Sequence, residues 1–520
     1  MASDPVHTVD HQLRAAAADS CDKRALLFGD EAWTYAEFER MAARVANGIA
    51  ALGVAQGEHV ALFMGNRPEY LFAWTGAARI GRPAVAVNAA LKGDGLAFVV
   101  DNADAVAVVV EDVLVDELLQ VLPRLPDVRH VVVVGSDVAH GLDEGRYVPW
   151  TDLVDQPASC PQVAVAPTEP MMLMYTSGTT GLPKGVVLSQ SRCVGPSLLL
   201  QAAGITGDDI GFTCLPFFHG GAALISFWGS FGLRIPLAFT RRFSASRHWA
   251  EVRRHRATFF NALGSIIPIL MKQQARIDDA DNPCRTVISA GCPLQLWRPF
   301  EERFGVSLFE WYATVEGGIT VAGPDAPPGS IGKAMPGQEA RVVRDDGTDT
   351  DVMEVGELVF RPDNGPATVD YYKNDEASTT KTQGGWLHTG DRVYRDDAGF
   401  LWYVDRGAHF IRRSGENISS VEVEQVINAH PEVLESAAYG LPSPLGEDDV
   451  AVAVVLRPGV ALAPQALVEW CEARMARFQV PRYIRVLDAL PKTATEKTQN
   501  LTLRSEGIVT GIYDRLAGAG

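Results

Sequence analysis

The chain has 520 residues, more than a single hydrophobic core usually supports, so we expect at least two domains. Hydrophobic residues make up 47% and charged residues 21%, which is ordinary for a globular protein, and the net charge of −18 opposes a broad nucleic-acid-binding surface. Anionic ligands must therefore be bound by local lysines, arginines and backbone N–H groups.

Seven cysteines are scattered along the chain, and none of them forms a CxxC pair. An odd number without paired spacing favours a reducing cytoplasm and argues against a zinc site. The first residues are polar and include Arg14, so no signal peptide is expected. The most apolar run, residues 220–239, is interrupted by Arg234 and Pro236, which predicts a buried helix and no transmembrane segment.

The N-terminal part of the chain alternates between predicted helices and strands. Residues 36–52 place Phe38, Met41, Val45 and Ile49 close to the 3.6-residue helical period, which predicts a helix. Strands are predicted at residues 59–64, 84–87, 105–110 and 130–134, and a further helix is predicted to begin at residues 66–69. This alternation predicts a parallel sheet that helices cover on both faces.

Residues 175–185 form a loop between two apolar segments, 171–174 and 186–188, that are predicted to be buried strands. The loop holds four aliphatic hydroxyls, three glycines and one lysine, which are donors that phosphate oxygens bind. It is not a Walker A loop, because Pro183 precedes Lys184 and a glycine follows. The plain structural alternative is a flexible hairpin. We interpret the run as a nucleotide-phosphate loop.

Three later segments are candidates for ligand contact. Residues 215–221 contain His219 before two glycines, although a lone histidine after aromatic residues is more often packed than catalytic. Strands are predicted to end at residues 290–293 and 313–318, and ligands bind beyond the carboxyl ends of strands in open α/β sheets.

Residues 259–270 predict an apolar helix. Ala262, Gly264 and Ser265 lie within it, and such small side chains allow another helix or a ligand to approach closely.

The composition of the chain changes after about residue 329. Residues 329–404 are rich in glycine and proline and predict an antiparallel β region, with strands at 356–361 and 398–404. A compact α+β unit of about a hundred residues is expected to follow, an ordinary domain size. Its predicted elements are strands at 409–413, 436–439, 450–456 and 483–486 and helices at 420–429 and 464–476. We place the boundary at residues 407–408, which gives an N-terminal domain of residues 1–407 and a C-terminal domain of residues 408–520.

In this order the motifs resemble those of the adenylate-forming superfamily, which includes acyl-CoA synthetases, peptide-synthetase adenylation domains and luciferases. The resemblance runs from about residue 25 to 505 and rests on residues 175–185, 329–333, 356–358, 371–375, 385–391, 414–419 and 490–497. The chain is most similar to carnitine/crotonobetaine-type and medium-chain acyl-CoA ligases. The resemblance implies an α/β fold: a large domain of parallel α/β subdomains with a β-barrel-like subdomain, and a small mobile α+β C-terminal domain.

The family activates a carboxylate in two half-reactions. The carboxylate attacks the α-phosphate of ATP, giving acyl-AMP and pyrophosphate, and the thiol of CoA then attacks the mixed anhydride after the small domain rotates. The resemblance therefore implies ATP or AMP, Mg²⁺ and coenzyme A as ligands and a small-molecule carboxylic acid as substrate. The small residues near His219 imply a hydrophobic, bulky acid.

The resemblance also assigns nucleotide contacts. The phosphates would be bound by Thr176, Ser177, Gly178, Thr179, Thr180 and Lys184. Tyr312 would stack on adenine, and residues 289–292 would form the other wall of the adenine site. The nucleotide-binding set further comprises Ala290, Gly291, Cys292, Glu310, Trp311, Ala313 and Val315. Asp391 and Arg406 would bind the ribose, and Glu316 would hold Mg²⁺, which prefers carboxylate oxygen. The plain alternative for Asp391 is a turn cap.

The remaining assignments concern the acyl group and the mobile domain. The acyl side would be formed by His219, Gly220, Ala262, Gly264 and Ser289. Lys497 would stabilise the charge that develops on the α-phosphate, although a lysine near a C-terminus is usually just solvated. Gly415 would line the pantetheine tunnel, and Ala408 would be the hinge, so the catalytic set is Lys497, Glu316, His219 and Gly415.

Four positions depart from the family pattern. Val315 replaces a threonine whose hydroxyl would contact the α-phosphate, and Glu496 replaces the glycine before the adenylation lysine. Ala408 and Gln190 replace the usual hinge residue and a histidine. Losing one hydrogen bond to a charged group costs about 1.5–3 kcal/mol, which would slow adenylation. Three interpretations follow: a complete ligase, an enzyme that only forms thioesters from acyl-AMP supplied by a separate adenylating enzyme, and an inactive nucleotide-binding regulator.

Overall fold

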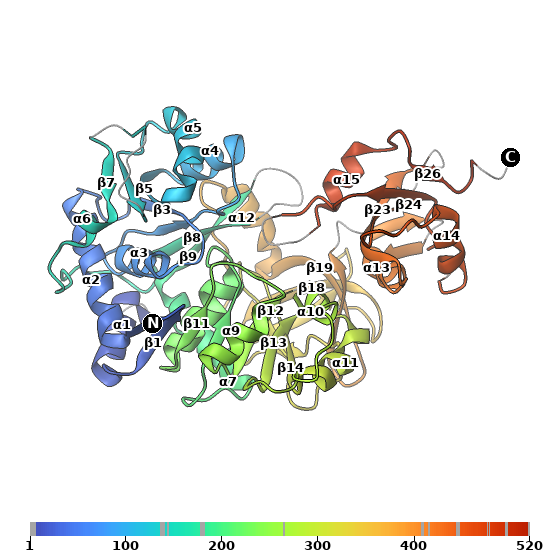
Figure 1. The fold of residues 1–520 in the computed structure, drawn as a ribbon, viewed down its shortest axis with the longest axis horizontal. Coiled ribbons are helices and arrows are strands. Elements are labelled where there is room, and N and C mark those ends of the chain that lie inside the picture. The colour runs from blue at the N-terminus through green and yellow to red at the C-terminus, as the bar shows by residue number, and fades with distance from the viewer. Residues whose placement is uncertain are drawn as a thin grey trace. The chain divides into compact units, whose positions relative to one another are not determined.

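The structure is a computed structural model that describes residues 7–135, 141–142, 145–176, 183–263, 266–406, 410–413, 416–443, 448–475, 477, 479–493 and 498–517. The chain divides into two compact units (Figure 1). Unit 1 comprises Met1–Gln338 and Arg361–Leu387, and unit 2 comprises Glu339–Phe360 and His388–Gly520. The boundary that we placed at residues 407–408 lies outside the described residues and stays a prediction.

Unit 1 contains a seven-stranded sheet. Its strands, in spatial order, are β7 (Tyr147–Pro149), β6 (His130–Val134), β5 (Ala105–Glu111), β3 (His59–Phe63), β4 (Ala84–Ala86), β8 (Pro170–Thr176) and β9 (Lys184–Ser189). All neighbours are parallel except β8 and β9. Along β3, Val60 and Leu62 pack into one buried cluster and Ala61 and Phe63 into another. Both faces are therefore covered, as the alternation of strands and helices predicted.

Helices form these two covers. α2 (Tyr35–Ala51) and α3 (Pro68–Ala78) share the cluster of Val60, and α4 (Gly93–Asn102) and α5 (Val115–Val121) share the cluster of Ala61 (Figure 1). α2 begins with a capping box: the Glu37 N–H donates to Thr34 Oγ1 at 3.2 Å, and the Thr34 N–H donates to Glu37 Oε2 at 2.8 Å. The predicted helix at 36–52 is confirmed.

A second sheet of unit 1 has nine strands. Their order is β16 (Lys333–Ala334), β15 (Ile319–Val321), β14 (Ser307–Ala313), β13 (Thr286–Ala290), β12 (Phe259–Leu263), β10 (Gly211–Thr213), β11 (Leu237–Phe239), β1 (Arg24–Phe28) and β2 (Glu31–Thr34). Further helices of unit 1 include α1 (Val9–Asp19), α6 (Trp150–Val154), α7 (Pro196–Ala202), α9 (His248–His255), α11 (Leu294–Phe304) and α12 (Asp375–Lys381).

The most apolar run folds as buried helix and strand. A π-helix, η5 (Gly221–Trp228), is buried along its whole length, and α8 (Gly229–Gly232) and β11 follow it. π-helical turns occur frequently at functional sites. Within the described part of the chain, no helix is long and apolar enough to cross a membrane.

The helix predicted at residues 259–270 is wrong. Its first part is the strand β12, which pairs with β10 and β13, and α10 (Ile266–Met271) begins only afterwards. A central strand that is buried on both faces has no alternation of polar and apolar residues, so its sequence cannot be told from that of a buried helix.

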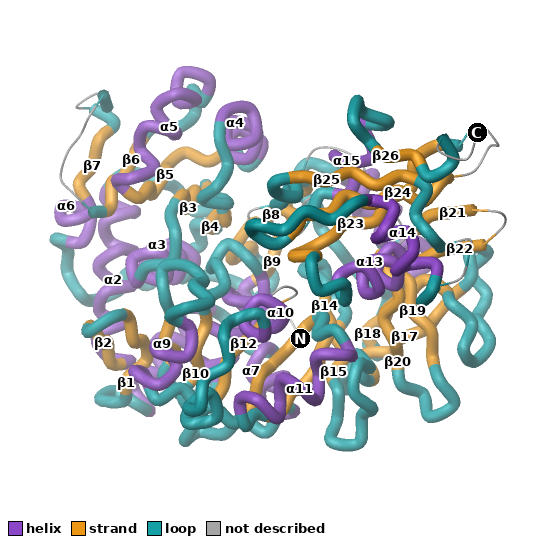
Figure 2. Tube along the Cα trace, turned by 45° about the vertical axis from the view of Figure 1, so that its right-hand side comes forward, coloured by secondary structure: helices purple, strands orange, loops and turns teal. Residues whose placement is uncertain are grey.

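Unit 2 combines an antiparallel region with an α+β region. The first holds a four-stranded sheet in the order β17 (Gln338–Val343), β18 (Gly356–Pro362), β19 (Leu387–Arg395) and β20 (Leu401–Arg406) (Figure 2). The second holds β21 (Phe410–Arg413), β22 (Glu416–Ser419), β23 (Val433–Pro442), β24 (Asp448–Leu456), β25 (Tyr483–Leu487) and β26 (Tyr513–Asp514), with α13 (Ser420–Asn428), α14 (Pro464–Glu472) and α15 (Asn500–Glu506). The predicted order of strands and helices is confirmed, whereas β22, β26 and α15 were not predicted.

Candidate active site

The predicted phosphate loop joins β8 to β9. Antiparallel pairing continues to the end of the hairpin, where Thr176 lies opposite Lys184. The Thr176 hydroxyl also donates to the Lys184 carbonyl at 3.5 Å. Ser177, Gly178, Thr179 and Thr180 lie outside the described residues, so their phosphate contacts stay predictions.

A segment from a later motif fixes this hairpin. The Tyr372 N–H donates to the Gly185 carbonyl at 2.8 Å, which ties residues 371–375 to β9. The Lys184 ammonium lies 5.5 Å from the centre of the Tyr371 ring, within the range of a cation–π contact. Two motifs that are far apart in the sequence therefore meet at one lysine.

The same tyrosine contacts the predicted magnesium ligand. The Tyr371 hydroxyl donates to Glu316 Oε1 at 2.7 Å. Among the described residues, no group of three or more His, Cys, Asp or Glu side chains is arranged to hold a metal. Mg²⁺ in nucleotide sites is usually held by one or two carboxylates, substrate phosphates and water, so the single carboxylate of Glu316 fits this role.

The adenine side is organised by a buried carboxyl. Ser289 on β13 lies opposite Glu310 on β14, and Glu310 is only 2% exposed. Glu310 Oε1 accepts hydrogen bonds from the N–H of Gly291 and, at 3.3 Å, from the N–H of Cys292. Glu310 Oε2 has no partner among the described residues, and burial raises the pKa of Glu310 to about 8. Glu310 therefore holds the loop predicted to contact adenine.

The two faces of β14 differ. Side chains alternate along a strand, so Tyr312 shares a face with Glu310, and Trp311 shares the other with Ala313. Trp311 is 6% exposed and packs in the main core, whereas Tyr312 is partly exposed. Of these residues, Tyr312 keeps the aromatic surface that could stack on adenine.

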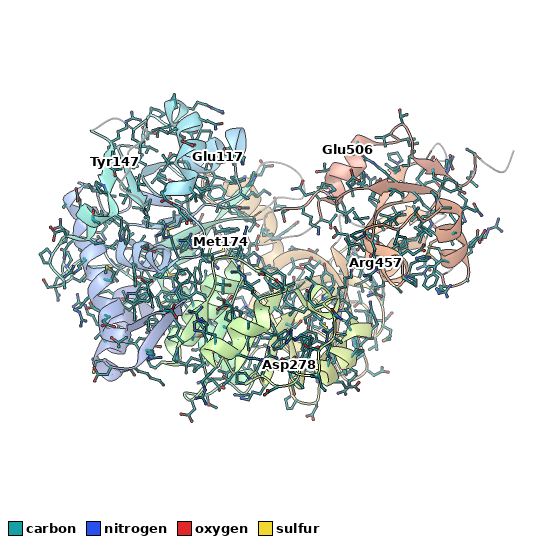
Figure 3. The ribbon with its side chains drawn as sticks, in the orientation of Figure 1. Glu117, Tyr147, Met174, Asp278, Arg457 and Glu506 are labelled. Atoms are coloured by element: carbon teal, nitrogen blue, oxygen red, sulfur yellow. The ribbon has the colours of Figure 1, made fainter. Side chains whose placement is uncertain are left out.

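The acyl side begins after β10. His219 Nδ1 accepts a hydrogen bond from the Gly221 N–H at 3.1 Å, so the neutral imidazole carries its proton on Nε2. A methyl group at Gly220 would lie 3.6 Å from Val315 Cγ2 and 3.8 Å from the sulfur of Met174, which Figure 3 labels. The predicted acyl wall thus adjoins the position where the family pattern has a threonine.

β12 contributes a residue that sequence reasoning missed. Asn261 Nδ2 donates to the Gly221 carbonyl at 2.9 Å, so Asn261 faces η5, and its Oδ1 is buried without a partner in the described part of the chain. Ala262, the predicted acyl residue, alternates to the other face and is 1% exposed. Gly264 and Ser265 lie outside the described residues. In the sequence, Asn261 is a polar residue among the apolar residues of 259–263, and this exception could have marked it as a candidate.

The ribose motif belongs to unit 2. Asp391 on β19 lies opposite Arg406 on β20 and is 4% exposed. The Asp391 N–H donates to Thr389 Oγ1 at 3.0 Å, and Glu357 of the 356–358 motif accepts the Gly390 N–H at 2.8 Å. The motif at 385–391 is therefore held by an earlier motif, while ribose binding stays a prediction.

The C-terminal catalytic positions are not described. Ala408, Gly415, Glu496 and Lys497 lie outside the described residues, so their roles stay predictions.

Gln190 has a structural role. Its side chain is fully buried, Oε1 accepts the Val9 N–H at 3.0 Å, and Nε2 donates to the Ala78 carbonyl at 2.9 Å. Nε2 also lies 3.4 Å from the Pro170 carbonyl. This departure from the family pattern joins α1, the end of α3 and the start of β8.

Comparison with known proteins agrees with this arrangement. Residues 13–372 match the family of AMP-binding enzymes, and residues 422–497 match the C-terminal domain of AMP-binding enzymes. The crotonobetaine/carnitine–CoA ligase of Escherichia coli O7:K1 is 31% identical over 478 residues, covering 89% of this chain and 92% of that protein.

Solved structures are similar over nearly the whole chain. The anthranilate CoA ligase AuaEII in complex with anthranoyl-AMP has a TM-score of 0.87 and 26% identity, covering 99% of this chain and 98% of that one. The O-succinylbenzoate coenzyme A synthetase of Bacillus subtilis in complex with AMP has a TM-score of 0.82 and 26% identity, covering 95% and 98%.

The fold and the two matched regions define an adenylate-forming enzyme. The chain belongs to the AMP-binding enzyme family. It is an AMP-forming acid–CoA ligase, and the resemblance that its motifs predicted is confirmed.

Proposed function

We propose that this ligase carries out both half-reactions on a hydrophobic, bulky carboxylic acid, forming an acyl-AMP and then a CoA thioester. The observation that carries the proposal is the arrangement around Tyr371, which contacts the Lys184 ammonium with its ring and the Glu316 carboxylate with its hydroxyl. A cation for the phosphates, at the ring, and a carboxylate for Mg²⁺, at the hydroxyl, thereby contact the same tyrosine side chain.

The roles of the protein side chains follow from this arrangement. Lys184 would bind the β- and γ-phosphates, Glu316 would hold Mg²⁺, and the bound metal would neutralise phosphate charge. Asp391 would bind the ribose, and Lys497 would stabilise the charge on the α-phosphate. CoA would pass Gly415 to reach the carbonyl carbon of the acyl-AMP.

The class of carboxylic acid is proposed from the residues that surround Gly220 at the predicted acyl side. Gly220, Val315 and Met174 approach one another there without a charged group among them, which supports an apolar acyl group. The relatives are named for crotonobetaine or carnitine, anthranilate and O-succinylbenzoate. These acids, with benzoate, octanoate and acetate, form a suitable test panel.

The test is turnover of the full chain with ATP, Mg²⁺, CoA and each acid, followed by mass spectrometry of the acyl-CoA and of AMP. We expect acyl-CoA from at least one bulky acid and little from acetate. If acetate were the best substrate, the proposed acid class would be wrong.

A pyrophosphate-exchange assay without CoA distinguishes a complete ligase from an enzyme that only forms thioesters from acyl-AMP. A complete ligase exchanges labelled pyrophosphate into ATP in the presence of its acid. An enzyme limited to thioester formation, as Val315 and Glu496 suggested, would show no exchange but would convert presynthesised acyl-AMP and CoA into acyl-CoA. AMP binding without either activity would indicate an inactive regulator.

A further inference from the structure

Arg192 is a cation in the candidate site to which no role has been assigned. It lies in η4 (Gln190–Cys193), the short 3₁₀ turn that follows β9. Its Nη2 donates to the Val315 carbonyl at 2.9 Å. The residue is half-buried, and burial lowers the pKa of its guanidinium while the Glu316 carboxylate raises it.

Within the described part of the chain, the charge of Arg192 is not balanced by a direct ion pair. Among the described residues, its one hydrogen bond goes to the neutral carbonyl of Val315, and no carboxylate forms an ion pair with it. A guanidinium has five N–H donors and stays protonated in proteins, so the residues that the structure describes leave most of these donors to a ligand. A partly desolvated cation gains most from an anion that it can bind through two parallel hydrogen bonds.

The neighbouring residues indicate which anion this is. Arg192 is hydrogen-bonded to Val315, the position where the family pattern has a threonine hydroxyl for the α-phosphate. Glu316, the proposed magnesium ligand, follows directly in the chain and acts electrostatically on Arg192. The side chain of Val315 would lie 3.6 Å from a methyl group at Gly220, which belongs to the predicted acyl wall. Arg192 therefore lies where the nucleotide and the acid would meet.

We propose that Arg192 binds the α-phosphate of the nucleotide and replaces the hydrogen bond that a threonine at position 315 would donate. This inference rests on the proposed function, since it requires AMP and ATP to bind beside Glu316. Guanidinium groups suit phosphate oxygens because their planar N–H fork matches two oxygens at once. Adenylation would then be retained despite Val315.

The first test compares AMP with adenosine, because neither probe depends on the identity of the acid. Calorimetry with the full chain should show that Arg192→Gln weakens AMP binding about ten- to a hundredfold while adenosine binding is unchanged. Arg192→Lys should give an intermediate affinity, since it keeps the charge without the fork. Arg276→Gln, which alters an exposed arginine, is the matched control.

The second test is a double-mutant cycle. Val315→Thr should change AMP affinity little in the parent protein but restore part of it in the Arg192→Gln variant, because the two groups would serve the same phosphate. Thermal unfolding establishes that each variant is folded. If Arg192→Gln does not fold, the cycle is made with Arg192→Lys.

Three results would overturn the inference. They are an unchanged AMP affinity in Arg192→Gln, an equal loss for AMP and adenosine, and strictly additive effects in the cycle. These results are distinct from a failure of the proposed function, which would appear as an absence of pyrophosphate exchange and of acyl-CoA with every acid in the panel.

Discussion

At the scale of single residues, the buried carboxyl of Glu310 makes the stability of the adenine side depend on pH. Its pKa is raised from 4.5 to about 8, so between these values the folded state keeps a proton that the unfolded state has lost. Stability is therefore lost as the pH rises through this window, by up to about 1.4 kcal/mol per pH unit.

Glu310→Gln should remove this dependence, because the amide has a similar shape and does not titrate. We expect the free energy of unfolding to fall less between pH 5 and pH 8 in the variant than in the parent, measured by urea titration at several pH values. Glu302→Gln, at an exposed position on α11, is the control. Parallel pH profiles for all three proteins would show that Glu310 is ionised in the folded state.

The buried amide of Gln190 provides a second prediction. Gln190→Ala would remove the partner of the Val9 N–H and one of two hydrogen bonds to the Ala78 carbonyl, which the Gly81 N–H also reaches at 3.0 Å. The free energy of unfolding should therefore fall by about 1–3 kcal/mol. Ser191→Ala, at the exposed neighbour, should change it by no more than about 0.5 kcal/mol. Chemical denaturation checks both values, and equal stability of the two variants would contradict the structural role.

Residues that stand within ordered motifs could be nominated from the sequence. Lys184, Glu316 and Asp391 each follow a short run whose chemistry or resemblance indicates a ligand. Tyr371 stands within the 371–375 motif, but its contact with Glu316, like the contact of Arg192 with Val315, could not be predicted, because the two partners are distant in the chain. Such contacts are decided by sheet order, which local patterns do not encode.

At the scale of elements, we expect Gly220, which directly precedes η5, to limit the size of the acyl group. A methyl group at Gly220 meets Val315 and Met174 at ordinary contact distances of 3.6 and 3.8 Å, so Gly220→Ala should be tolerated. Gly220→Leu should lower kcat/KM for a bulky acid by at least about tenfold and affect acetate less.

The control for this substitution is Gly207→Leu, since a side chain at Gly207 would enter open space. Competition between acids, read as relative kcat/KM, gives the comparison directly. A uniform loss of activity for all acids in Gly220→Leu would indicate a distorted helix and would remove Gly220 from the acyl wall.

Helices and strands could be predicted where apolar residues recur with the spacing typical of that element. The helix at 36–52 has one apolar face and a capping box, and both signals are local. β12 was mistaken for a helix because it is a central strand, paired with β10 and β13, whose successive side chains on both faces of the sheet are buried. The same loss of periodicity affects any strand at the centre of a parallel sheet.

At the scale of the whole molecule, the two half-reactions should be separable by substitutions in the C-terminal domain. Lys497→Ala should abolish pyrophosphate exchange while acyl-AMP and CoA still give a thioester, because the role proposed for the lysine is confined to the α-phosphate. Gly415→Ile should do the reverse, since a bulky side chain would obstruct pantetheine. Each half-reaction is measured in both variants, and loss of both activities in either one would refute the separation.

The course of the chain through β17 to β20 determines where this protein could be recombined with a relative. β17 and β18 end at Pro362, whereas β19 and β20 begin at Leu387, so one four-stranded sheet draws on two separated stretches of sequence. A chimera joined near residue 388 would combine β17 and β18 of one parent with β19 and β20 of the other, and mismatched cross-strand pairs would leave the new sheet weakly specified. A junction after β20, which ends at Arg406, would inherit the sheet from a single parent. Exchange of C-terminal segments between ligases should therefore succeed at that junction and fail about twenty residues earlier.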